Sequence, residues 1–327
     1  MVSISCPTDR KAVSTSITVV GRQLRQVVSR DDDTAPLSET FDRQIPWFTG
    51  GGQRQIGRLR VGIVGLGGTG AQVAQSLVYL GTRDFVLVDD DAADQTNMNR
   101  LVTATAADLE TNKTVLARRL IRSVAPDARV TVAANLQSAH ALGSLTDVDV
   151  VFGCVDNDGA RLIMNELAVA YRIPYFDLGV GIDADRGNVT EAGGRLAVVI
   201  PDGPCLSCMN EIDVAEAAFF LASPEQRRLQ IDRGYVRGMD VRAPSVVSIN
   251  GTLAGLAVTE FAVLVSGVRP ITPFTELDIL GRSRSTPSQW VTPRSVKRVP
   301  GCITCAIAGW GNAIHLERYQ SAENGGD

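Results

Sequence analysis

Residues 58–81 read RLRVGIVGLGGTGAQVAQSLVYLG, and the fold class of the chain can be inferred from this stretch. Its first part, 59–66, is a mostly apolar run, which is typical of a strand buried on both faces of a parallel sheet. Its second part, 68–81, carries apolar residues at helical spacing and ends on Gly81, which predicts a helix. The intervening GLGGTG, at 65–70, satisfies the spacing G-x-G-x-x-G. A glycine-rich loop between a strand and a helix predicts a site for a phosphate-bearing nucleotide.

The glycines of this loop have separate roles in such a site. Gly65 permits the tight turn, Gly67 lets the backbone approach a phosphate, and Gly70 allows the helix to pack closely on the strand. The additional glycine, Gly68, fits a backbone that lies close to a triphosphate. Asp89 ends the strand that follows, where an acid accepts the hydroxyls of a ribose. These features suit a nicotinamide dinucleotide and ATP equally, so the loop alone leaves the chemistry open.

Strand and helix patterns alternate along the chain as far as about residue 187, which predicts an α/β fold with a doubly wound, Rossmann-like, mostly parallel sheet. Later residues indicate short antiparallel strands, a long apolar helix over 245–268 and a last strand over 274–280, an antiparallel C-terminal extension of the sheet. Further strands are expected over 85–91, 128–135, 148–157 and 174–181, and further helices over 109–124 and 159–173. The stretch 16–28 is expected to form a strand and a short helix.

Two cations and one carboxylate favour ATP over a nicotinamide. Arg100 lies just past the second strand, and Lys113 follows thirteen residues later. Attack on the α-phosphate of ATP builds negative charge on phosphoryl oxygens and on departing pyrophosphate, which fixed cations stabilise. Asp156, at the carboxyl end of the fourth strand, can hold the Mg²⁺ that bridges ATP phosphates, and Asn157 can hydrogen-bond nearby. The alternative for the acids at 89–91 is a solvated strand end.

The six cysteines include two C-x-x-C pairs, Cys205 with Cys208 and Cys302 with Cys305. Four thiolates make a tetrahedral Zn²⁺ site with no open position for water, which is typical of a structural site. Such a site would hold the C-terminal segment against the rest of the domain. The alternative is a pair of redox-active dithiols.

The composition sets limits on location and partners. The net charge of -4 and a composition of 44% hydrophobic and 21% charged residues give no reason to expect nucleic acid or a membrane as partner. No signal peptide is evident, so we expect a cytoplasmic protein. Residues 1–45 are expected to be an N-terminal extension and linker, and 46–327 one domain that includes the zinc-bound C-terminal segment.

Several motifs in order resemble the ThiF/MoeB/HesA adenylyltransferases, relatives of the ubiquitin-activating enzymes. The resemblance runs from about Phe41 to about Cys305. Its motifs are DRQ at 42–44, GLGGTG, the strand end LVDDD, NMNR at 97–100, the lysine in ETNKT, CVDN at 154–157 and both cysteine pairs. It implies that a carboxylate attacks ATP to give an acyl-adenylate and pyrophosphate, with ATP, Mg²⁺ and structural Zn²⁺ as the cofactors.

The resemblance also implies roles for individual residues. Arg43 resembles an arginine that members of the family insert into the ATP site of a partner subunit, which predicts a homodimer. Arg43 could also be an exposed charge, since residues 54–60 are basic as well. The catalytic residues expected are Arg43, Arg100, Lys113 and Asp156. The nucleotide-binding residues expected are Gly65, Gly67, Gly68, Gly70, Asp89, Asp91, Asn97, Arg100, Lys113, Asp156 and Asn157.

The chain departs from the family in the segment that crosses over the adenylate. Many relatives carry a cysteine there, whereas the comparable stretch here, DRGYVRGMDVRAPSVVSING, has none. Unless Cys154 or a zinc ligand serves, the chain has no nucleophile for a thioester. This favours an enzyme that stops at the adenylate or passes it to an external amine or thiol. Leu101 also stands where relatives often have a glutamine.

The leading hypothesis is therefore an ATP-dependent adenylyltransferase. Its carboxylate could belong to a ubiquitin-like protein, to a peptide C-terminus or to a small acid. The alternatives are an NAD-dependent oxidoreductase, which leaves Arg100, Lys113 and Asp156 unexplained, and a non-catalytic partner subunit that retains the nucleotide fold. A set of arginines could dock an acidic partner, although such a set is more often solvated surface. These arginines are Arg227, Arg228, Arg233, Arg237 and Arg242.

Overall fold

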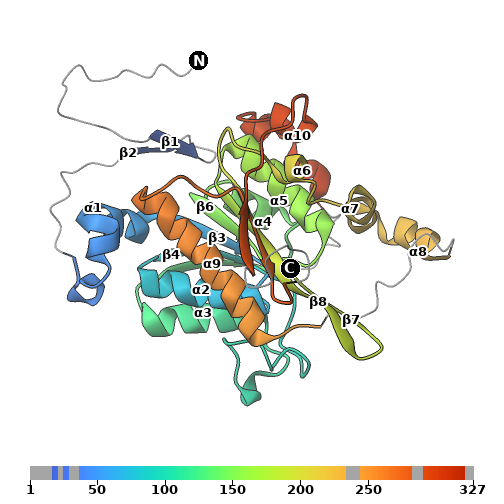
Figure 1. Ribbon diagram of the computed structural model, residues 1–327, viewed down its shortest axis with the longest axis horizontal. Helices are drawn as coiled ribbons and strands as arrows, with labels where there is room; N and C mark the ends of the chain where they lie inside the picture. Colours follow the sequence, from blue (N-terminus) through green and yellow to red (C-terminus); the bar gives the residue numbers. More distant parts are fainter. Residues whose placement is uncertain (1–16, 21–24, 29–36, 233–243, 282–289, 321–327) are drawn as a thin grey trace.

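The computed structural model describes residues 17–20, 25–28, 37–232, 244–281 and 290–320 (Figure 1). Its centre is an eight-stranded sheet with the order β10-β9-β8-β7-β6-β3-β4-β5. The five strands from β7 to β5 in this order are parallel, and β8, β9 and β10 are antiparallel additions. The strands are β3 (Arg60–Val64), β4 (Asp84–Val88), β5 (Arg129–Ala133), β6 (Val150–Gly153), β7 (Tyr175–Asp185), β8 (Asn188–Val199), β9 (Phe274–Asp278) and β10 (Val291–Arg294).

The strand order places the crevice of the fold between β3 and β6. The chain runs from β3 outward through β4 to β5, then returns to the other side of β3 for β6 and β7. Such a reversal opens a space at the carboxyl ends of the two central strands, where ligands bind in doubly wound sheets. The mostly parallel sheet with its antiparallel extension confirms the predicted fold class.

Helices cover both faces of the sheet and bury its side chains in two large clusters. The first face is covered by α2 (Gly68–Leu80), α3 (Lys113–Val124) and α9 (Val247–Ser266), with α1 (Ile45–Arg58) packed on α9. The second face is covered by α4 (Ala139–Leu145), α5 (Asp158–Tyr171), α6 (Leu206–Met209) and α10 (Ile303–Ala306). Because the central strands are buried on both faces, their sequences are nearly continuous apolar runs.

The remaining elements lie outside the sheet and its two helical layers. Two helices, α7 (Val214–Leu221) and α8 (Pro224–Asp232), extend away from the body of the molecule, and α7 packs on α5 (Figure 1). The remaining elements are β1 (Ile17–Val20), β2 (Arg25–Val28), η1 (Glu39–Phe41), η2 (Ala106–Asp108), η3 (Gly311–Ile314) and η4 (Leu316–Tyr319).

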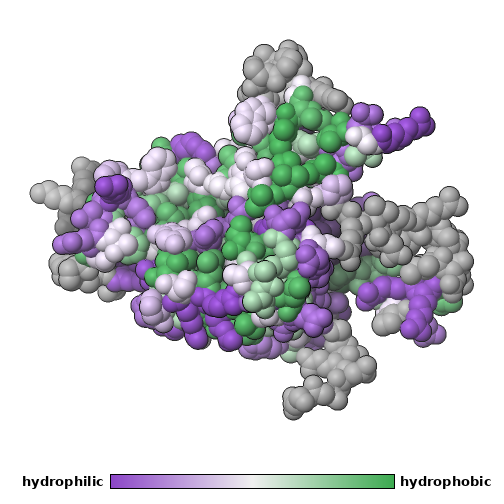
Figure 2. Space-filling view, turned by 90° about the horizontal axis from the view of Figure 1, so that it is seen from below, coloured by the Kyte–Doolittle hydropathy of each residue, from purple (hydrophilic) through white to green (hydrophobic). Residues whose placement is uncertain are grey.

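Helix α9 is long and apolar enough to cross a membrane by length and composition, and half of its apolar window is buried inside the protein. It packs on α2 and on the sheet, and its one acid, Glu260, is buried and paired with Arg269. These contacts are those of a core helix. On the face seen in Figure 2, polar residues are interspersed with apolar ones, so that face is not uniformly apolar.

Several sequence expectations were wrong in detail. Within the stretch 16–28, Ile17–Val20 and Arg25–Val28 pair as two antiparallel strands, β1 and β2, where a strand and a helix were expected. The helix expected over 109–124 begins only at Lys113, because Asn112 pairs with Ala92 in an isolated β-bridge. Helix α1 was not anticipated, since its glycine-rich sequence has low helix propensity. Most of the N-terminal extension and part of the 232–251 crossover lie outside the described residues.

Candidate functional site

The glycine loop joins β3 to α2 at the crevice, and two of its glycines are required by the protein itself. Gly65 has a φ of +85°, and a β-carbon added there would lie 2.5 Å from the carbonyl oxygen of Cys154. A β-carbon at Gly70 would lie 2.9 Å from the carbonyl carbon of Gly65. Both positions therefore permit the close approach of the loop to β6 and of α2 to the loop.

The other two glycines face side chains or open space. A β-carbon at Gly68 would collide with the side-chain amide of Asn250 and would lie 3.1 Å from the stem of Arg100. A β-carbon at Gly67 would meet nothing within 4 Å, and the φ of Gly67 is -68°. Neither backbone strain nor packing therefore requires glycine at 67. Because no side chain caps the start of α2, its first N–H groups suit an anion.

Asp89 braces the loop from the end of β4. One carboxylate oxygen accepts a hydrogen bond from the backbone N–H of Leu66 at 2.5 Å, and the other accepts one from Asp91 at 2.9 Å. Burial raises the pKa of the Asp89 carboxyl, against the opposing effects of the Lys113 charge and these two N–H groups. The predicted ribose-binding acid thus also fixes the shape of the glycine loop.

Lys113 begins α3 beside the same strand end. Its side chain is almost fully buried, and its ammonium lies 2.5 Å from a carboxylate oxygen of Asp91 and 3.8 Å from one of Asp89. Its backbone N–H also donates to the carbonyl of Asp91. The sequence prediction placed all three residues at the nucleotide. The structure brings them together as one cation held between two carboxylates.

The segment at 94–100 presents Arg100 to the loop. Asn97 is buried, and its side-chain oxygen accepts the backbone N–H of Asp94, so it holds the turn together. Arg100 is half-buried, donates to the carbonyl of Thr96 at 2.7 Å and lays its stem against Gly68. Of the two predicted ligands, Asn97 therefore has a structural contact, and Arg100 lies directly beside the loop.

Asp156 and Asn157 follow β6, the strand next to β3. Asp156 is exposed, and the described residues provide it with no hydrogen bond or ion pair. Asn157 caps α5 by accepting the backbone N–H of Ala160 at 2.8 Å. Cys154 contacts Gly65, and Asp156 follows Cys154 by two residues. Asp156 is therefore close in sequence to the point where β6 meets the glycine loop. The strand ends of β3, β4 and β6 thus gather the predicted residues along one edge of the sheet.

Cys154 lies directly beneath the loop. Burial raises the pKa of its thiol, and the nearby charge of Asp177 raises this pKa further. A thiol with a raised pKa remains neutral and is a poor nucleophile. Cys154 is therefore unsuited to accept an acyl group, although its side chain is only half-buried and not fully buried as predicted.

Arg43 lies at the far end of α2 from the loop. It is exposed in the turn between η1 and α1. Its neighbour Gln44 donates to the carbonyl of Tyr79, and Phe41 contacts Gly81 at the C-terminal end of α2. A helix of 13 residues is about 20 Å long. The structure thus separates Arg43 from the glycine loop of its own chain by about the length of α2.

Sequence reasoning missed two parts of the site. Asn250 is a buried polar residue of α9, held by Ser245 and pressed against Gly68. The signal available was a single polar residue in an apolar helix. Leu101 packs into a small cluster with Ala71 and Leu116, so the glutamine expected from relatives is replaced by an apolar contact.

The second missed part is a buried charge cluster around Asp177, the last residue of β7 that pairs with β6. The Asp177 side chain is fully buried, accepts a hydrogen bond from Tyr175 at 2.5 Å and forms ion pairs with Arg161 and Arg195. Arg195 also pairs with Glu211. Burial raises the pKa of the Tyr175 hydroxyl well above its ordinary value, so it remains a donor. The cluster fixes two guanidinium groups close to the carboxyl end of β6.

The four paired cysteines form one cluster, although 97 residues separate the pairs in sequence. Their sulfur atoms all lie within 4.8 Å of one another, and neighbouring sulfurs are 3.5 to 3.8 Å apart. A tetrahedron with Zn–S distances of about 2.3 Å has edges of about 3.8 Å. The cluster of Cys205, Cys208, Cys302 and Cys305 therefore fits a zinc ion, as predicted.

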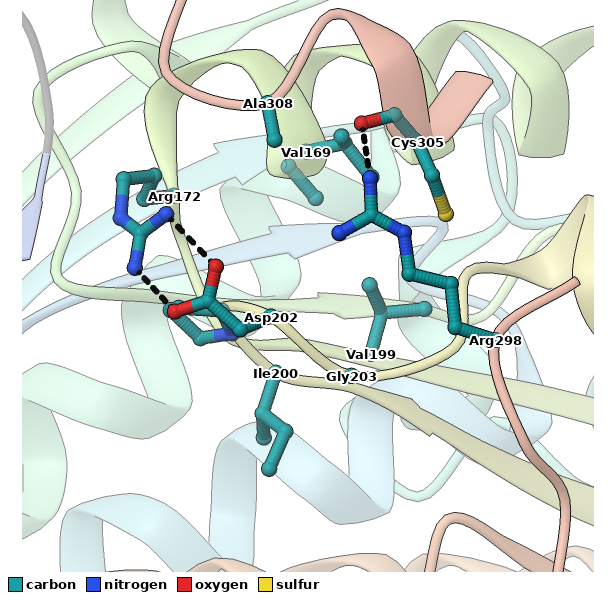
Figure 3. Close-up of a pocket in the computed structure, with 11 residues that line it drawn as sticks. Val169, Arg172, Val199, Ile200, Asp202, Gly203, Arg298, Cys305 and Ala308 are labelled. Carbon is teal, nitrogen blue, oxygen red and sulfur yellow. Dashed lines mark hydrogen bonds and ion pairs between the residues drawn. The ribbon is translucent and has the colours of Figure 1, made fainter. Parts of the chain in front are cut away.

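Side chains outside the cluster hold its second pair in place. Arg298 donates to the carbonyl of Cys305 at 2.6 Å, above a small cavity of about 20 Å³ (Figure 3). On the other wall of this cavity, Arg172 and Asp202 form a bidentate ion pair. The cavity is too small for a substrate, so these contacts have a structural role.

The fold and this site define the class as a nucleotidyltransferase with a Rossmann-like nucleotide-binding fold. The chain belongs to the ThiF family, whose model matches residues 41–295. This membership confirms the resemblance inferred from the ordered motifs.

Relatives and solved structures agree with this assignment. The sulfur carrier protein ThiS adenylyltransferase of Escherichia coli is 28% identical over 258 residues, 78% of this chain and 88% of that relative. The SAMP-activating enzyme E1 of Haloferax volcanii is 30% identical over 159 residues, 48% of this chain and 56% of that relative. The chain thus spans only about half the length of this second relative. MccB of E. coli with ATP has a TM-score of 0.61 at 18% identity, over 82% of this chain and 75% of that structure, a likeness of fold.

Proposed function

We propose that this protein catalyses the ATP-dependent adenylation of a carboxylate at the C-terminus of a peptide or ubiquitin-like protein. The observation that carries the proposal is the set of charged groups around the glycine loop. Arg100 lies against the loop, Lys113 lies at the end of β4, and Asp156 follows β6. The names of the relatives, a ThiS adenylyltransferase and a SAMP-activating enzyme, support this chemistry.

The reaction requires no nucleophilic side chain. An oxygen of the substrate carboxylate attacks the α-phosphorus of ATP, the bond to the β-phosphate oxygen breaks, and the products are an acyl-adenylate and pyrophosphate. The loop and the start of α2 hold the phosphates, and Asp89 accepts the ribose hydroxyls. Arg100 and Lys113 stabilise the charge that moves onto pyrophosphate. Asp156 is the residue that would hold Mg²⁺, which supplies further charge neutralisation.

Lys113 is positioned for this work before ATP arrives. Asp89 and Asp91 hold its buried ammonium, so the cation does not have to be desolvated or ordered during the reaction. Asp91 is mostly exposed, and its side chain can turn towards a ligand while Asp89 remains beneath. This geometry supports separate roles for the two acids, one in the loop and one at its open edge.

The fate of the adenylate follows from the cysteines. Cys154 is half-buried and its raised pKa keeps the thiol neutral, four cysteines form the zinc-type cluster, and Cys6 lies outside the described residues. The segment at 232–251 contains no cysteine, and part of it lies outside the described residues. We therefore propose that an external amine or thiol accepts the acyl group directly from the adenylate.

We further propose that the active form is a homodimer located in the cytoplasm. Arg43 lies about one helix length from its own loop, so it would act in the site of a partner subunit. An Arg43→Ala variant should then be rescued by mixing it with an Asp156→Ala variant, because each mixed dimer contains one site with both residues. Absence of rescue, with mixed dimers verified by mass, would oppose this part of the proposal.

The test of the proposed reaction is pyrophosphate exchange into ATP in the presence of synthetic peptides with free C-terminal carboxylates. Asp156→Ala should abolish exchange without changing the melting temperature, because Asp156 is exposed and has no partner among the described residues. Asp202→Ala, which removes an exposed acid on the zinc side of the sheet, is the matched control. Unchanged exchange in Asp156→Ala would refute its role. Tight NAD binding without any use of ATP would refute adenylation itself.

A further inference from the structure

A large groove opens beside the proposed adenylation site. Its cavity volume is about 960 Å³, and it lies between the start of α5, the segment at 210–213 and the strands β7, β8 and β9. Asp158 and Arg161 of α5 line it, and Asp156 precedes Asp158 by only two residues. A volume of this size is at the upper end of the range for small-molecule pockets. The groove therefore has room for several residues of an extended chain.

The floor of the groove is one face of the β7–β8 hairpin. Gly179 lies opposite Arg195, Gly181 opposite Gly193, and Asp183 opposite Glu191. Directly paired residues of antiparallel strands point to the same face, and so do alternate residues along each strand. The other face of the hairpin, with Val180 and Gly194, packs towards α9. The hairpin thus presents a row with arginine at its inner end, bare glycines in the middle and acids at its outer end.

The inner end is rigid and lies closest to the proposed reaction. A β-carbon at Gly179 would lie 3.3 Å from the guanidinium of Arg195 and 3.5 Å from that of Arg161. Asp177 holds both guanidinium groups from beneath. In the middle of the row the β7 side is open, because a β-carbon at Gly181 would meet nothing within 4 Å. On the β8 side, a β-carbon at Gly193 would collide with the carbonyl of Leu277 in β9. A peptide backbone can therefore pass over Gly181 of β7, beyond the two guanidinium groups at the inner end.

The outer end carries a like-charge pair that the fold does not explain. Asp183 and Glu191 are directly opposed across the hairpin, both are exposed, and neither forms an ion pair among the described residues. Like charges directly opposite each other destabilise a sheet. A cation bound between them would remove this cost.

The groove as a whole is acidic. Its lining includes two guanidiniums and seven carboxylates, a formal net charge of -5. Arg161 and Arg195 are already paired with acids of the same lining or beneath it. On the neighbouring strand β9, Glu276 pairs with Arg294, and Asp278 lies opposite Gly193 in the middle of the row, where its carboxylate accepts the backbone N–H groups of Leu280 and Gly281. The two acids that form no ion pair among the described residues, Asp183 and Glu191, lie at the outer end, away from the reaction.

We propose that this groove selects substrates whose C-terminal segment carries a basic residue about four positions before the residue that is activated. This inference rests on the proposed function. From Gly179 to Asp183 the strand advances four residues, or about 13 Å at 3.3 Å per residue. An extended substrate that ends near Arg195 therefore places its fourth preceding residue between Asp183 and Glu191. The occupant is a cationic peptide tail, and a small acid would leave most of the groove empty.

The test uses three fluorescent heptapeptides of alanine with a C-terminal glycine. They carry lysine, alanine or glutamate at the fourth position before the terminal residue. We expect the lysine peptide to bind the full-length protein about tenfold more tightly than the glutamate peptide, from two exposed charge contacts. The ratio should fall towards one in the double variant D183N/E191Q and in high salt. Asp185→Asn, at the tip of the same hairpin and outside the groove lining, is the matched control and should keep the ratio.

Binding by fluorescence anisotropy and pyrophosphate exchange separate the two proposals. Equal affinity for the three peptides, or tighter binding of the glutamate peptide, would overturn the charge selection, whatever the exchange assay gives. A preference that persists unchanged in D183N/E191Q would overturn the assignment to this groove. Selective binding of the lysine peptide without any exchange would support the groove and count against adenylation.

Discussion

In the nucleotide loop, we expect the fold to require glycine at position 65 and the bound ligand to require glycine at position 67. Replacing Gly65 with alanine places a β-carbon 2.5 Å from the carbonyl oxygen of Cys154, where a carbon and an oxygen normally stay about 3.3 Å apart. The residue would also be held at a φ of +85°, which costs an ordinary residue about 1–2 kcal/mol. Overpacking of this kind adds about 1–3 kcal/mol. We expect Gly65→Ala to lose about 2–5 kcal/mol of stability.

Gly67→Ala is the matched substitution in the same loop. Its β-carbon meets nothing within 4 Å, and its φ of -68° suits alanine. Its stability should stay within about 1 kcal/mol of the parent or rise slightly, because alanine restricts the unfolded chain. Its ATP affinity should nevertheless fall by about tenfold or more, since the added methyl group occupies the space into which a phosphate must fit.

Urea unfolding measures the first difference, and calorimetric titration with ATP measures the second. We expect opposite patterns, a stability loss for Gly65→Ala and an affinity loss without a stability loss for Gly67→Ala. If Gly67→Ala bound ATP like the parent, the loop would not hold phosphates in the way proposed. If Gly65→Ala melted with the parent, the close approach of the loop to Cys154 would be wrong.

Three further predictions concern the cysteines and the buried charges. The purified protein should contain one zinc per chain by metal analysis. Cys302→Ser should lose the metal and have a lower melting temperature by calorimetry. Full stability without metal would refute a structural site. Asp177→Asn should lose about 3 kcal/mol in urea unfolding, because it removes the fully buried carboxylate that Arg161 and Arg195 share and leaves each of these mostly buried guanidiniums with a single acid. Asp202→Asn, in a surface pair, should lose less than about 1 kcal/mol, and similar losses would contradict this account. Because the pKa of the Cys154 thiol is raised, iodoacetamide at about pH 8 should not label it in the folded protein but should label it in guanidinium. Peptide mass mapping identifies the labelled site. Rapid labelling of the native chain would make Cys154 a candidate acyl acceptor again.

The parts of the fold that were predicted correctly depend on neighbouring residues. The strand, loop and helix over 59–81 follow from apolar periodicity and glycine spacing, which act over a few residues. The boundary at Lys113 and the helix α1 were missed because the bridge between Ala92 and Asn112 and a glycine-rich helix are set by tertiary contacts against weak local preference. The cysteine cluster was predicted from two short motifs, and the fold supplied the contact between pairs 97 residues apart.

The class of fold, the family and the identity of most residues at the loop follow from local patterns and from an ordered set of motifs, so the amino-acid sequence alone predicts them. Tertiary contacts determine which of these residues hold the protein together and which remain open to a ligand. Asp89 braces the loop, Asn157 caps α5, and Gly67 faces open space. The acidic groove also belongs to the tertiary structure alone. Asp183 and Glu191 are ordinary surface acids in the sequence, and the register of the hairpin places them side by side because strand pairing joins residues that the chain keeps apart.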